Sequence, residues 1–251
     1  MRITAYAIGH GMCRVVAHGA WWSGQTPNPQ SEKMRISLSR TRSTIRQIIY
    51  CNDFELFVSF TASDDAQGRK PTRESVTKQV MNSLRRLRRT WGISARYLLV
   101  PELSDTGRWH VHGLLGGLPE SYLCTLPSSS AYNICNRPKK PFQCYYIPIL
   151  STDYLYCYAE NIVSDGGPEG LAYLQAYLCK ALYPDIYPYE PHVRRYHPSR
   201  NLLRPDTIYD GDISVKEFRT ICSLSATTQT DGNSRILYLS RQDAEAFLCS
   251  K

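Results

Sequence analysis

Two histidines separated by one residue, His110 and His112, stand in an apolar run that alternates as a β-strand does. Because successive side chains of a strand point to opposite faces, we expect both imidazoles on the same face. The preceding apolar run ends at Glu102. Two imidazoles and one carboxylate can hold a divalent cation and leave positions open for water and substrate oxygens. Histidine pairs also occur in strands for purely structural reasons, so chelation and packing both stay open here.

The position of Glu102 depends on the loop between the runs 97–102 and 109–115. A three-residue loop at 105–107, with Gly107 in the left-handed conformation, places Glu102 directly across from His110. A two-residue loop places Glu102 opposite Trp109 and on the wrong face. The carboxylate is therefore expected beside the histidines only if the hairpin has the longer loop.

A second chemical feature lies on the helix predicted at 171–182, which follows a strong turn signal. Tyr173 and Tyr177 are four residues apart and share one face, and Lys180 follows on the same side. A cation beside a tyrosine hydroxyl favours the phenolate and makes a better nucleophile. Tyrosine pairs at this spacing also pack in cores, and the chain has 18 tyrosines, so both interpretations remain.

The composition is that of an ordinary globular protein with an anionic partner. The 251 residues include 30 Lys and Arg against 22 Asp and Glu, a formal charge of +8, and 42% hydrophobic residues exclude a disordered chain. No apolar run is long enough for a bilayer span. The nine cysteines are odd in number and contain no Cys-x-x-Cys pair, which favours reduced thiols in a cytosol.

The elements that must position these residues follow from periodicity. We expect a short basic helix at 37–50, a strand at 54–63 and a helix at 72–91 that begins at Thr72. The outer face of the last helix carries a run of arginines, namely Arg85, Arg86, Arg88 and Arg89. Such a run either contacts phosphates or is simply solvated.

The rest of the chain gives weaker signals. Strands are expected at 144–150, 154–161 and 235–240, a loop at 225–230 and a short helix from Arg241. Residues 1–35 show no lasting periodicity and stay unassigned. We therefore expect an N-terminal arm at 1–35, a main domain at 36–212 and a C-terminal extension at 213–251 packed on the same domain.

The order of these motifs resembles the HUH endonucleases, specifically the rolling-circle replication initiators of plasmids and small single-stranded-DNA phages. The resemblance extends over about Thr41 to Asp212. It is carried by Phe-Val-Ser-Phe-Thr in the strand at 54–63, by Pro101-Glu102, by Trp109-His110-Val111-His112-Gly113-Leu114-Leu115, by Tyr-x-x-x-Tyr-x-x-Lys at 173–180 and by Tyr196-His197-Pro198-Ser199.

The resemblance implies an α+β fold with a central antiparallel sheet of the RNA-recognition or palm type and helices packed on it. It implies Mg²⁺ or Mn²⁺ held by His110, His112 and Glu102. It further implies that Tyr177, with Lys180 beside it, attacks a phosphate to give a 5′-phosphotyrosyl link, and that Tyr173 is a second nucleophile. Such an enzyme nicks and rejoins single-stranded DNA to start rolling-circle replication.

The partner implied is single-stranded DNA at a replication origin, in the cytoplasm of a bacterial host, with no membrane. Because no Gly-x-x-x-x-Gly-Lys-Ser/Thr loop is present, we expect a host helicase and polymerase to complete the reaction. The backbone contacts are expected from basic side chains, namely Arg85, Arg86, Arg88, Arg89, Arg108, Arg194, Arg195 and Arg200. The alternatives are an HUH transposase or relaxase, or a non-catalytic basic module that binds nucleic acid.

Overall fold

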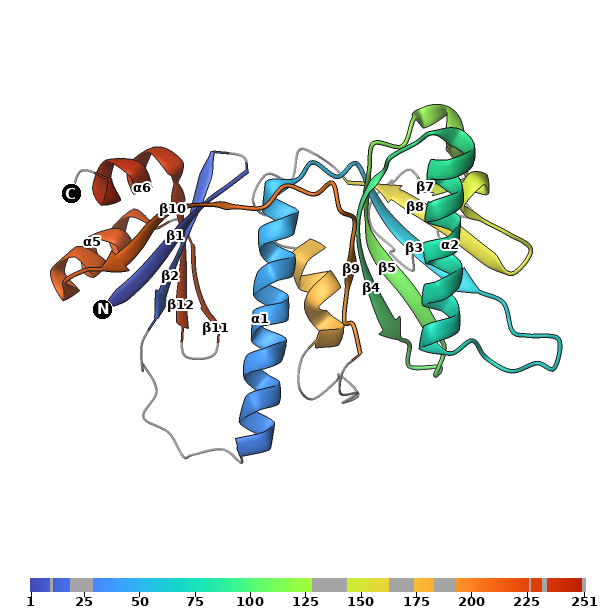
Figure 1. Cartoon of the computed structure of the whole chain (residues 1–251), viewed down its shortest axis with the longest axis horizontal. Coiled ribbons are helices and arrows are strands. Elements are labelled where there is room, and N and C mark those ends of the chain that lie inside the picture. Colours follow the sequence, from blue (N-terminus) through green and yellow to red (C-terminus); the bar gives the residue numbers. More distant parts are fainter. Residues whose placement is uncertain are drawn as a thin grey trace. The chain divides into compact units, whose positions relative to one another are not determined.

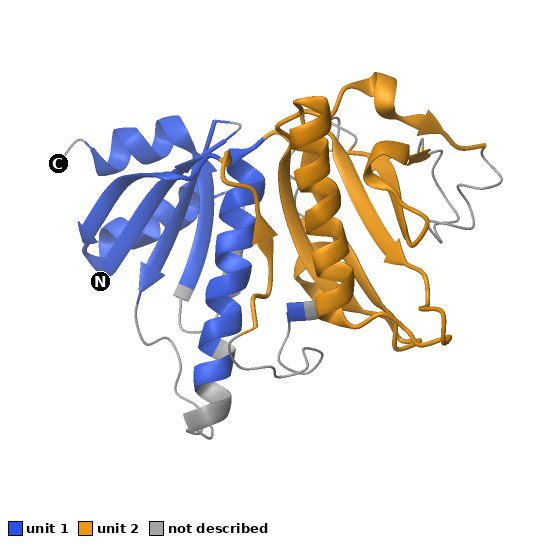
Figure 2. Ribbon diagram, turned by 45° about the vertical axis from the view of Figure 1, so that its right-hand side comes forward, with its two compact units in different colours: residues 1–52, 182–187, 203–251 blue, residues 53–181, 188–202 orange. Residues whose placement is uncertain are grey.

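The computed structural model describes residues 1–9, 11–18, 29–127, 144–162, 174–182, 193–225, 227–231 and 234–249. The chain forms two compact units (Figure 2). Unit 1 contains residues 1–52, 182–187 and 203–251, and unit 2 contains residues 53–181 and 188–202. This division differs from the stretches 1–35, 36–212 and 213–251 expected from the sequence, because strands from both ends of the chain pair with each other.

Unit 1 is built on an antiparallel five-stranded sheet in the order β10-β1-β2-β12-β11. Its strands are β1 (Arg2–Ile8), β2 (Met12–His18), β10 (Asp206–Asp212), β11 (Thr227–Asp231) and β12 (Ser234–Ser240). Residues 2–8 and 12–18, which the sequence left unassigned, therefore form strands in the interior of this sheet. The loop expected at 225–230 is wrong, since residues from Thr227 pair in register with β12.

Helices cover both faces of the sheet in unit 1. On one face, α5 (Val215–Leu224) and α6 (Arg241–Leu248) bury Phe218, Ile221 and Leu248 against the strands. On the other face lies α1 (Pro29–Cys51), whose Tyr50 ring contacts that of Tyr238. The basic helix expected at 37–50 is therefore real but begins earlier.

Unit 2 is built on an antiparallel seven-stranded sheet in the order β6-β7-β8-β3-β5-β4-β9 (Figure 1). Its strands are β3 (Leu56–Ala62), β4 (Arg96–Leu103), β5 (Trp109–Gly116), β6 (Cys124–Thr125), β7 (Cys144–Tyr146), β8 (Leu155–Asn161) and β9 (His197–Pro198). The histidine-bearing strand β5 lies between β3 and β4. Mixed helices and antiparallel sheets agree with the expected α+β class.

The helix α2 (Arg73–Trp91) connects β3 to β4, and β5 returns between these two strands as a split β-α-β unit. Thr72 caps the helix by accepting a hydrogen bond from the Ser75 amide, and Gly92 ends it in the left-handed conformation. Its apolar side pairs Val76 and Val80 with Phe60 and the rest of the core on one face of the sheet. The other face of this sheet is not covered by α2.

Shorter elements complete unit 2. The 3₁₀ helices are η1 (Glu120–Tyr122), η2 (Pro148–Leu150) and η4 (Lys180–Leu182), the last of which crosses into unit 1. Residues 174–179 are helical, in agreement with the helix expected at 171–182. The strand expected at 144–150 is shorter than expected, because Pro148 begins η2.

The β4–β5 hairpin has the three-residue loop on which the position of Glu102 depended. Ser104 and Arg108 close the turn through a backbone hydrogen bond, and Gly107 has a φ of 73°. Glu102 pairs with His110 in the resulting register. The prediction for this hairpin is therefore confirmed.

Among the described residues, no helix is long and apolar enough to cross a membrane. The described cysteines are all free thiols.

Candidate active site

One face of the sheet in unit 2 gathers polar side chains from three adjacent strands. His112 lies directly opposite Ser59 of β3. In the neighbouring row His110 lies between Thr61 of β3 and Glu102 of β4. Since residues directly opposite each other share a face, these five side chains lie on the side of the sheet away from α2.

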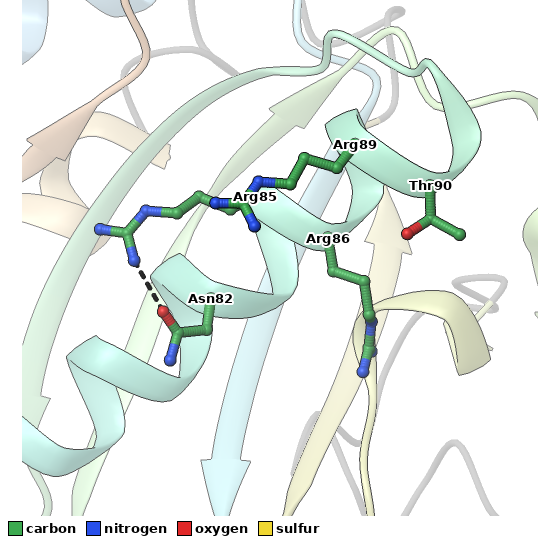
Figure 3. Close-up of a pocket in the computed structure, with 5 residues that line it drawn as sticks. All are labelled: Asn82, Arg85, Arg86, Arg89 and Thr90. Carbon is green, nitrogen blue, oxygen red and sulfur yellow. Dashed lines mark hydrogen bonds between the residues drawn. The ribbon is translucent and has the colours of Figure 1, made fainter.

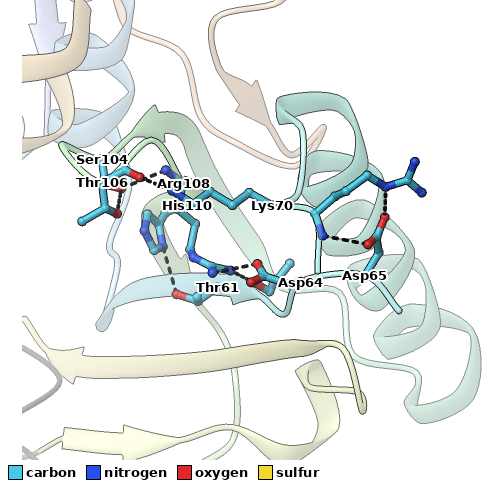
Figure 4. Close-up of polar contacts among 10 residues, drawn as sticks. Thr61, Asp64, Asp65, Lys70, Ser104, Thr106, Arg108 and His110 are labelled. Atoms are coloured by element: carbon cyan, nitrogen blue, oxygen red, sulfur yellow. Dashed lines mark hydrogen bonds and ion pairs between the residues drawn. The ribbon is translucent and has the colours of Figure 1, made fainter. Parts of the chain in front are cut away.

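Each histidine is held by a hydroxyl from β3. Ser59 Oγ lies 2.8 Å from His112 Nδ1, and Thr61 Oγ1 lies 3.0 Å from His110 Nδ1. Figure 4 shows the second of these contacts. When each Nδ1–H donates to its hydroxyl, Nε2 keeps its lone pair and faces away from β3. The two hydroxyls can therefore fix both imidazoles in the tautomer that a metal ligand needs.

His112 stays uncharged over the physiological range. Burial lowers its pKa to about 3, with further lowering by the nearby charges of His110 and Lys180. The pKa of His110 is also lowered, by burial and by Arg108. Neutral imidazoles keep the nitrogen lone pairs that bind metal ions.

Glu102 joins the histidines to a cation on the helix at 174–182. Its Oε1 lies 2.8 Å from Lys180 Nζ, and its Oε2 lies 3.7 Å from His112 Nε2. Because His112 is neutral, Lys180 is the charged partner of this carboxylate. Partial burial alone lowers the pKa of Lys180, but Glu102 and Tyr177 outweigh that effect and raise it. Lys180 is therefore a stable ammonium group.

Tyr177 lies over the same face. Its ring meets His112 edge-on with 5.7 Å between ring centroids, and it meets Phe57 edge-on at 5.3 Å. Lys180 Nζ lies 4.1 Å from the centroid of the Tyr177 ring. The Tyr177 ring thus lies next to both His112 and Lys180, and Lys180 in turn is paired with the Glu102 carboxylate. Tyr173, the other tyrosine expected in the site, lies outside the described residues.

The donor atoms agree in chemistry with a divalent cation. Among the described residues, no group of three His, Cys, Asp or Glu side chains is arranged so that it could hold a metal ion. His110 and His112 nevertheless offer neutral imidazoles oriented by hydroxyls, and Glu102 adds a carboxylate beside them. Nitrogen and carboxylate ligands that leave open positions suit a cation that must also bind a substrate oxygen. The ligand types of these three residues therefore suit a divalent cation, but in this structure the carboxylate is paired with Lys180.

Comparison with protein families gives a match over the strands that carry the site. The family model for the replication-associated protein ORF2 matches residues 55–180, just over half of the chain. The chain belongs to the ORF2 replication-associated family. A search of curated proteins and a search of solved structures each found no match. Family membership supports a role in replication initiation.

The part of the chain that carries the ORF2 family match begins beside β3 and ends at Lys180. It therefore contains Tyr177, both histidines, their hydroxyl partners and Glu102, while the strands of unit 1 lie outside it. The residues 193–202 of unit 2 also lie outside it.

In this ORF2-family protein the arginines of α2 do not lie on the face of the sheet that carries the histidines. The helix packs on the opposite side of the sheet, and Arg88 is exposed there. Arg85, Arg86 and Arg89, with Asn82 and Thr90, line a shallow hollow of about 280 Å³ (Figure 3). Arg86 also donates to the carbonyls of Ile149 and Ser151 and so ties α2 to η2.

Arg108 has a structural role at the hairpin. Its guanidinium pairs with Asp64 at 2.7 Å and donates to the Ala62 carbonyl, which joins the loop after β3 to the start of β5 (Figure 4). Lys70 of the same loop donates to the Thr106 carbonyl. These contacts hold the loop and the turn together beside His110.

The remaining expected arginines flank β9. Arg194 and Arg200 are exposed, and Arg195 is half-buried. Arg85 and Arg200 both lower the pKa of Tyr97 against the larger raising effect of burial, so they lie near the same residue. The basic side chains thus gather on the α2 side of the sheet and around β9.

Sequence reasoning missed Ser59 and Thr61. The signal was present, because the strand at 54–63 places two hydroxyl side chains two residues apart among apolar neighbours. Hydroxyls at alternate positions of a half-buried strand need polar partners. The histidine pair on the neighbouring strand supplies them.

Proposed function

We propose that this chain nicks and rejoins single-stranded DNA through a 5′-phosphotyrosyl intermediate and so initiates rolling-circle replication. The observation that carries the proposal is the position of Tyr177, whose ring contacts both the His112 imidazole and the Lys180 ammonium. Membership of a replication-associated family agrees with this activity.

In the proposed reaction Tyr177 Oη attacks the phosphorus of the scissile phosphodiester. The new bond joins Oη to phosphorus, and the bond between phosphorus and the 3′ oxygen breaks. The phenolic proton passes to water, and the departing 3′ oxygen takes a proton from water. Rejoining is the reverse, in which a 3′-hydroxyl attacks the phosphotyrosine. Because the phosphodiester energy is kept in the covalent link, no ATP is needed.

Lys180 favours the phenolate of Tyr177, since a nearby positive charge stabilises the ionised form. Ser59 and Thr61 hold the imidazoles, and Glu102 keeps Lys180 in place. When Mg²⁺ or Mn²⁺ is bound by His110, His112 and Glu102, it supplies positive charge that polarises the scissile phosphate. The proposed substrate is single-stranded DNA at the origin of the element that encodes the chain.

The test is covalent capture of DNA. Labelled single strands that tile the encoding element are incubated with the protein in Mn²⁺ or in EDTA, and adducts are resolved on a denaturing gel and mapped to a peptide. We expect a metal-dependent adduct on Tyr177 that is abolished by Tyr177→Phe while DNA binding is retained. Tyr209→Phe, which removes a hydroxyl bonded to the Asp212 carbonyl in unit 1, is the matched control and should leave capture intact.

Normal capture by Tyr177→Phe would transfer the role to another tyrosine, and Tyr173→Phe then decides between them. The absence of any adduct, together with salt-sensitive binding, would instead favour a non-catalytic module that binds nucleic acid.

A further inference from the structure

Three tyrosines continue the two rows that contain the histidines. On β8, Tyr158 lies opposite Ser59 and Tyr156 lies opposite Thr61. On β7, Tyr146 lies opposite Tyr158. Opposite residues share a face, so the three rings lie on the histidine face of the sheet, beyond the hydroxyls of β3. We call Tyr146, Tyr156 and Tyr158 the tyrosine platform.

The platform is accessible although its strands are firmly held. Tyr156 is 38% exposed, and Tyr146 and Tyr158 are half-buried. The alternating residues of β8, including Leu155 and Cys157, point the other way and are fully buried in the core under α2. The strand backbone is thus fixed by its buried side, while its other side presents aromatic rings.

The rings form one group. The centroids of Tyr146 and Tyr158 are 5.7 Å apart with 49° between the ring planes. Burial raises the pKa of Tyr158, and Tyr146 and Tyr156 raise it further. The platform therefore consists of adjacent phenol rings, which offer flat apolar surfaces edged by hydroxyls.

We propose that the tyrosine platform stacks the bases of the single strand whose phosphate enters the site beside Tyr177. This inference rests on the proposed function and adds to it a binding subsite. Base stacking suits neutral aromatic rings and tolerates any sequence, since every base has a flat face. Adjacent strands lie about 4.8 Å apart, so the β8 backbone is about 10 Å from the His110 backbone. That span matches one or two nucleotides of an extended strand.

The continuity of the tyrosine platform with the histidine row also supports single-stranded DNA as the ligand. One row of opposite residues runs across the sheet from Glu102 through His110 and Thr61 to Tyr156. A DNA strand bound along this row can place one phosphate beside Glu102 and His110 and stack the bases of the adjacent nucleotides on Tyr156. The platform is therefore continuous with the site where the phosphate is expected.

The experiment measures equilibrium binding in EDTA, where no cleavage interferes. One probe is a labelled oligothymidylate of about 20 nucleotides, and the other is an abasic backbone of the same length and charge. The variants are Tyr156→Ala, Tyr158→Ala, the double variant and Tyr158→Phe. Trp91→Ala is the matched control, because Trp91 is an exposed aromatic at the end of α2.

We expect the wild type to bind the oligothymidylate more tightly than the abasic backbone. Tyr156→Ala and Tyr158→Ala each weaken binding of the oligothymidylate about tenfold and leave binding of the abasic backbone unchanged. Tyr158→Phe and Trp91→Ala bind as the wild type does. Should the double variant fail to fold, as judged by its circular dichroism melt, the exposed Tyr156 decides the question alone.

The platform is refuted if the alanine variants keep the wild-type preference for the probe that carries bases. Equal loss of affinity for both probes also refutes it, because the loss is then in the backbone contacts. If the alanine variants lose more affinity for oligouridylate than for oligothymidylate, the ligand of the platform is RNA and not DNA. The proposed nicking activity is judged separately by covalent capture, so either proposal can fail while the other stands.

Discussion

Lys180 Nζ lies 2.8 Å from Oε1 of Glu102. This ion pair joins the helix at 174–182 to the hairpin strand β4 and brings an ammonium group next to the Tyr177 ring. The carboxylate of Glu102 thus already has a positively charged partner within the chain. Lys180 thus has two roles in the proposed reaction, one toward Glu102 and one toward the nucleophile.

Lys180→Met is expected to slow single-turnover formation of the DNA adduct about 100-fold, because a preorganised charge beside the reacting oxygen is removed. Equilibrium binding of DNA should change far less. The matched control is Lys78→Met on the outer side of α2, which should react at the wild-type rate. A Lys180→Met protein that reacts as fast as the wild type would contradict the role given to this residue.

Ser59→Ala and Thr61→Val remove the hydroxyls that contact His112 and His110. Loss of such partners weakens metal binding about 10- to 100-fold, since the imidazoles are no longer held in one tautomer and orientation. The dissociation constant for Mn²⁺, measured by electron paramagnetic resonance without DNA, checks this expectation. Thr90→Val at the exposed end of α2 is the control, and wild-type affinity in both site variants would show that the hydroxyls are dispensable.

Gly113→Ala is expected to destabilise the protein by about 1–3 kcal/mol through overpacking. A Cβ at this position clashes with the Leu98 carbonyl oxygen and comes within 2.6 Å of a Leu99 side-chain atom, so β5 must move away from β4. Gly68→Ala serves as comparison, because Gly68 has open space and only an unfavourable φ of 72°. Urea unfolding of the two variants should show the larger loss of stability for Gly113→Ala, and the reverse order would disprove this packing argument.

His197 makes stability fall on acidification. Burial lowers its pKa to about 4, with help from Arg194 and Arg73. The unfolded chain, with a pKa near 6.5, then binds more protons than the folded one between about pH 6.5 and 4. The free energy of unfolding is therefore highest above about pH 6.5 and decreases toward pH 4.

His110 and His112 act in the same direction, so the informative quantity is the difference between wild type and His197→Asn. Chemical unfolding across this range should give a shallower pH dependence for the variant. If the free energy of unfolding depends on pH in the same way for the wild type and for His197→Asn, His197 does not contribute to the pH dependence of stability.

The hollow on α2 is expected to bind a DNA phosphate. Replacement of Arg85 and Arg89 by Gln should reduce the slope of log affinity against log salt by about 0.7 for each phosphate of the single strand that is no longer neutralised. Arg241→Gln, which breaks an ion pair with Glu245 on α6, is the matched control. An unchanged slope in the double variant would identify these arginines as a solvated face.

Local patterns were sufficient for the parts of unit 2 that carry the site. The turn residues at 105–107 determine a register that brings Glu102 opposite His110, and Thr72 with the apolar period of α2 determines that helix. These features depend on residues close together in the chain, where turn chemistry and periodicity act directly. The grouping of Tyr177 with His112 could be inferred only from the resemblance to a known family.

Unit 1 could not be predicted in the same way, because its strands pair across the whole chain. Arg2 pairs with Asp212 and also with His18, and Thr227 becomes a strand through its pairing with Tyr238. Such pairing overrides a local polar composition like that of 227–230. The faces of the sheet posed a similar difficulty, since the sequence does not reveal that α2 and its arginines cover the side opposite the histidines.

The turn between β4 and β5 contributes no side chain to the site, yet it decides which residues form it. Substitutions of Asp105 or Thr106 leave the strand pairing as it is, whereas one residue inserted or deleted slides β5 along β4 and turns His110 and His112 toward the core. The chemistry of this face therefore depends on how many residues the turn contains and on Gly107, whose φ of 73° the three-residue turn requires.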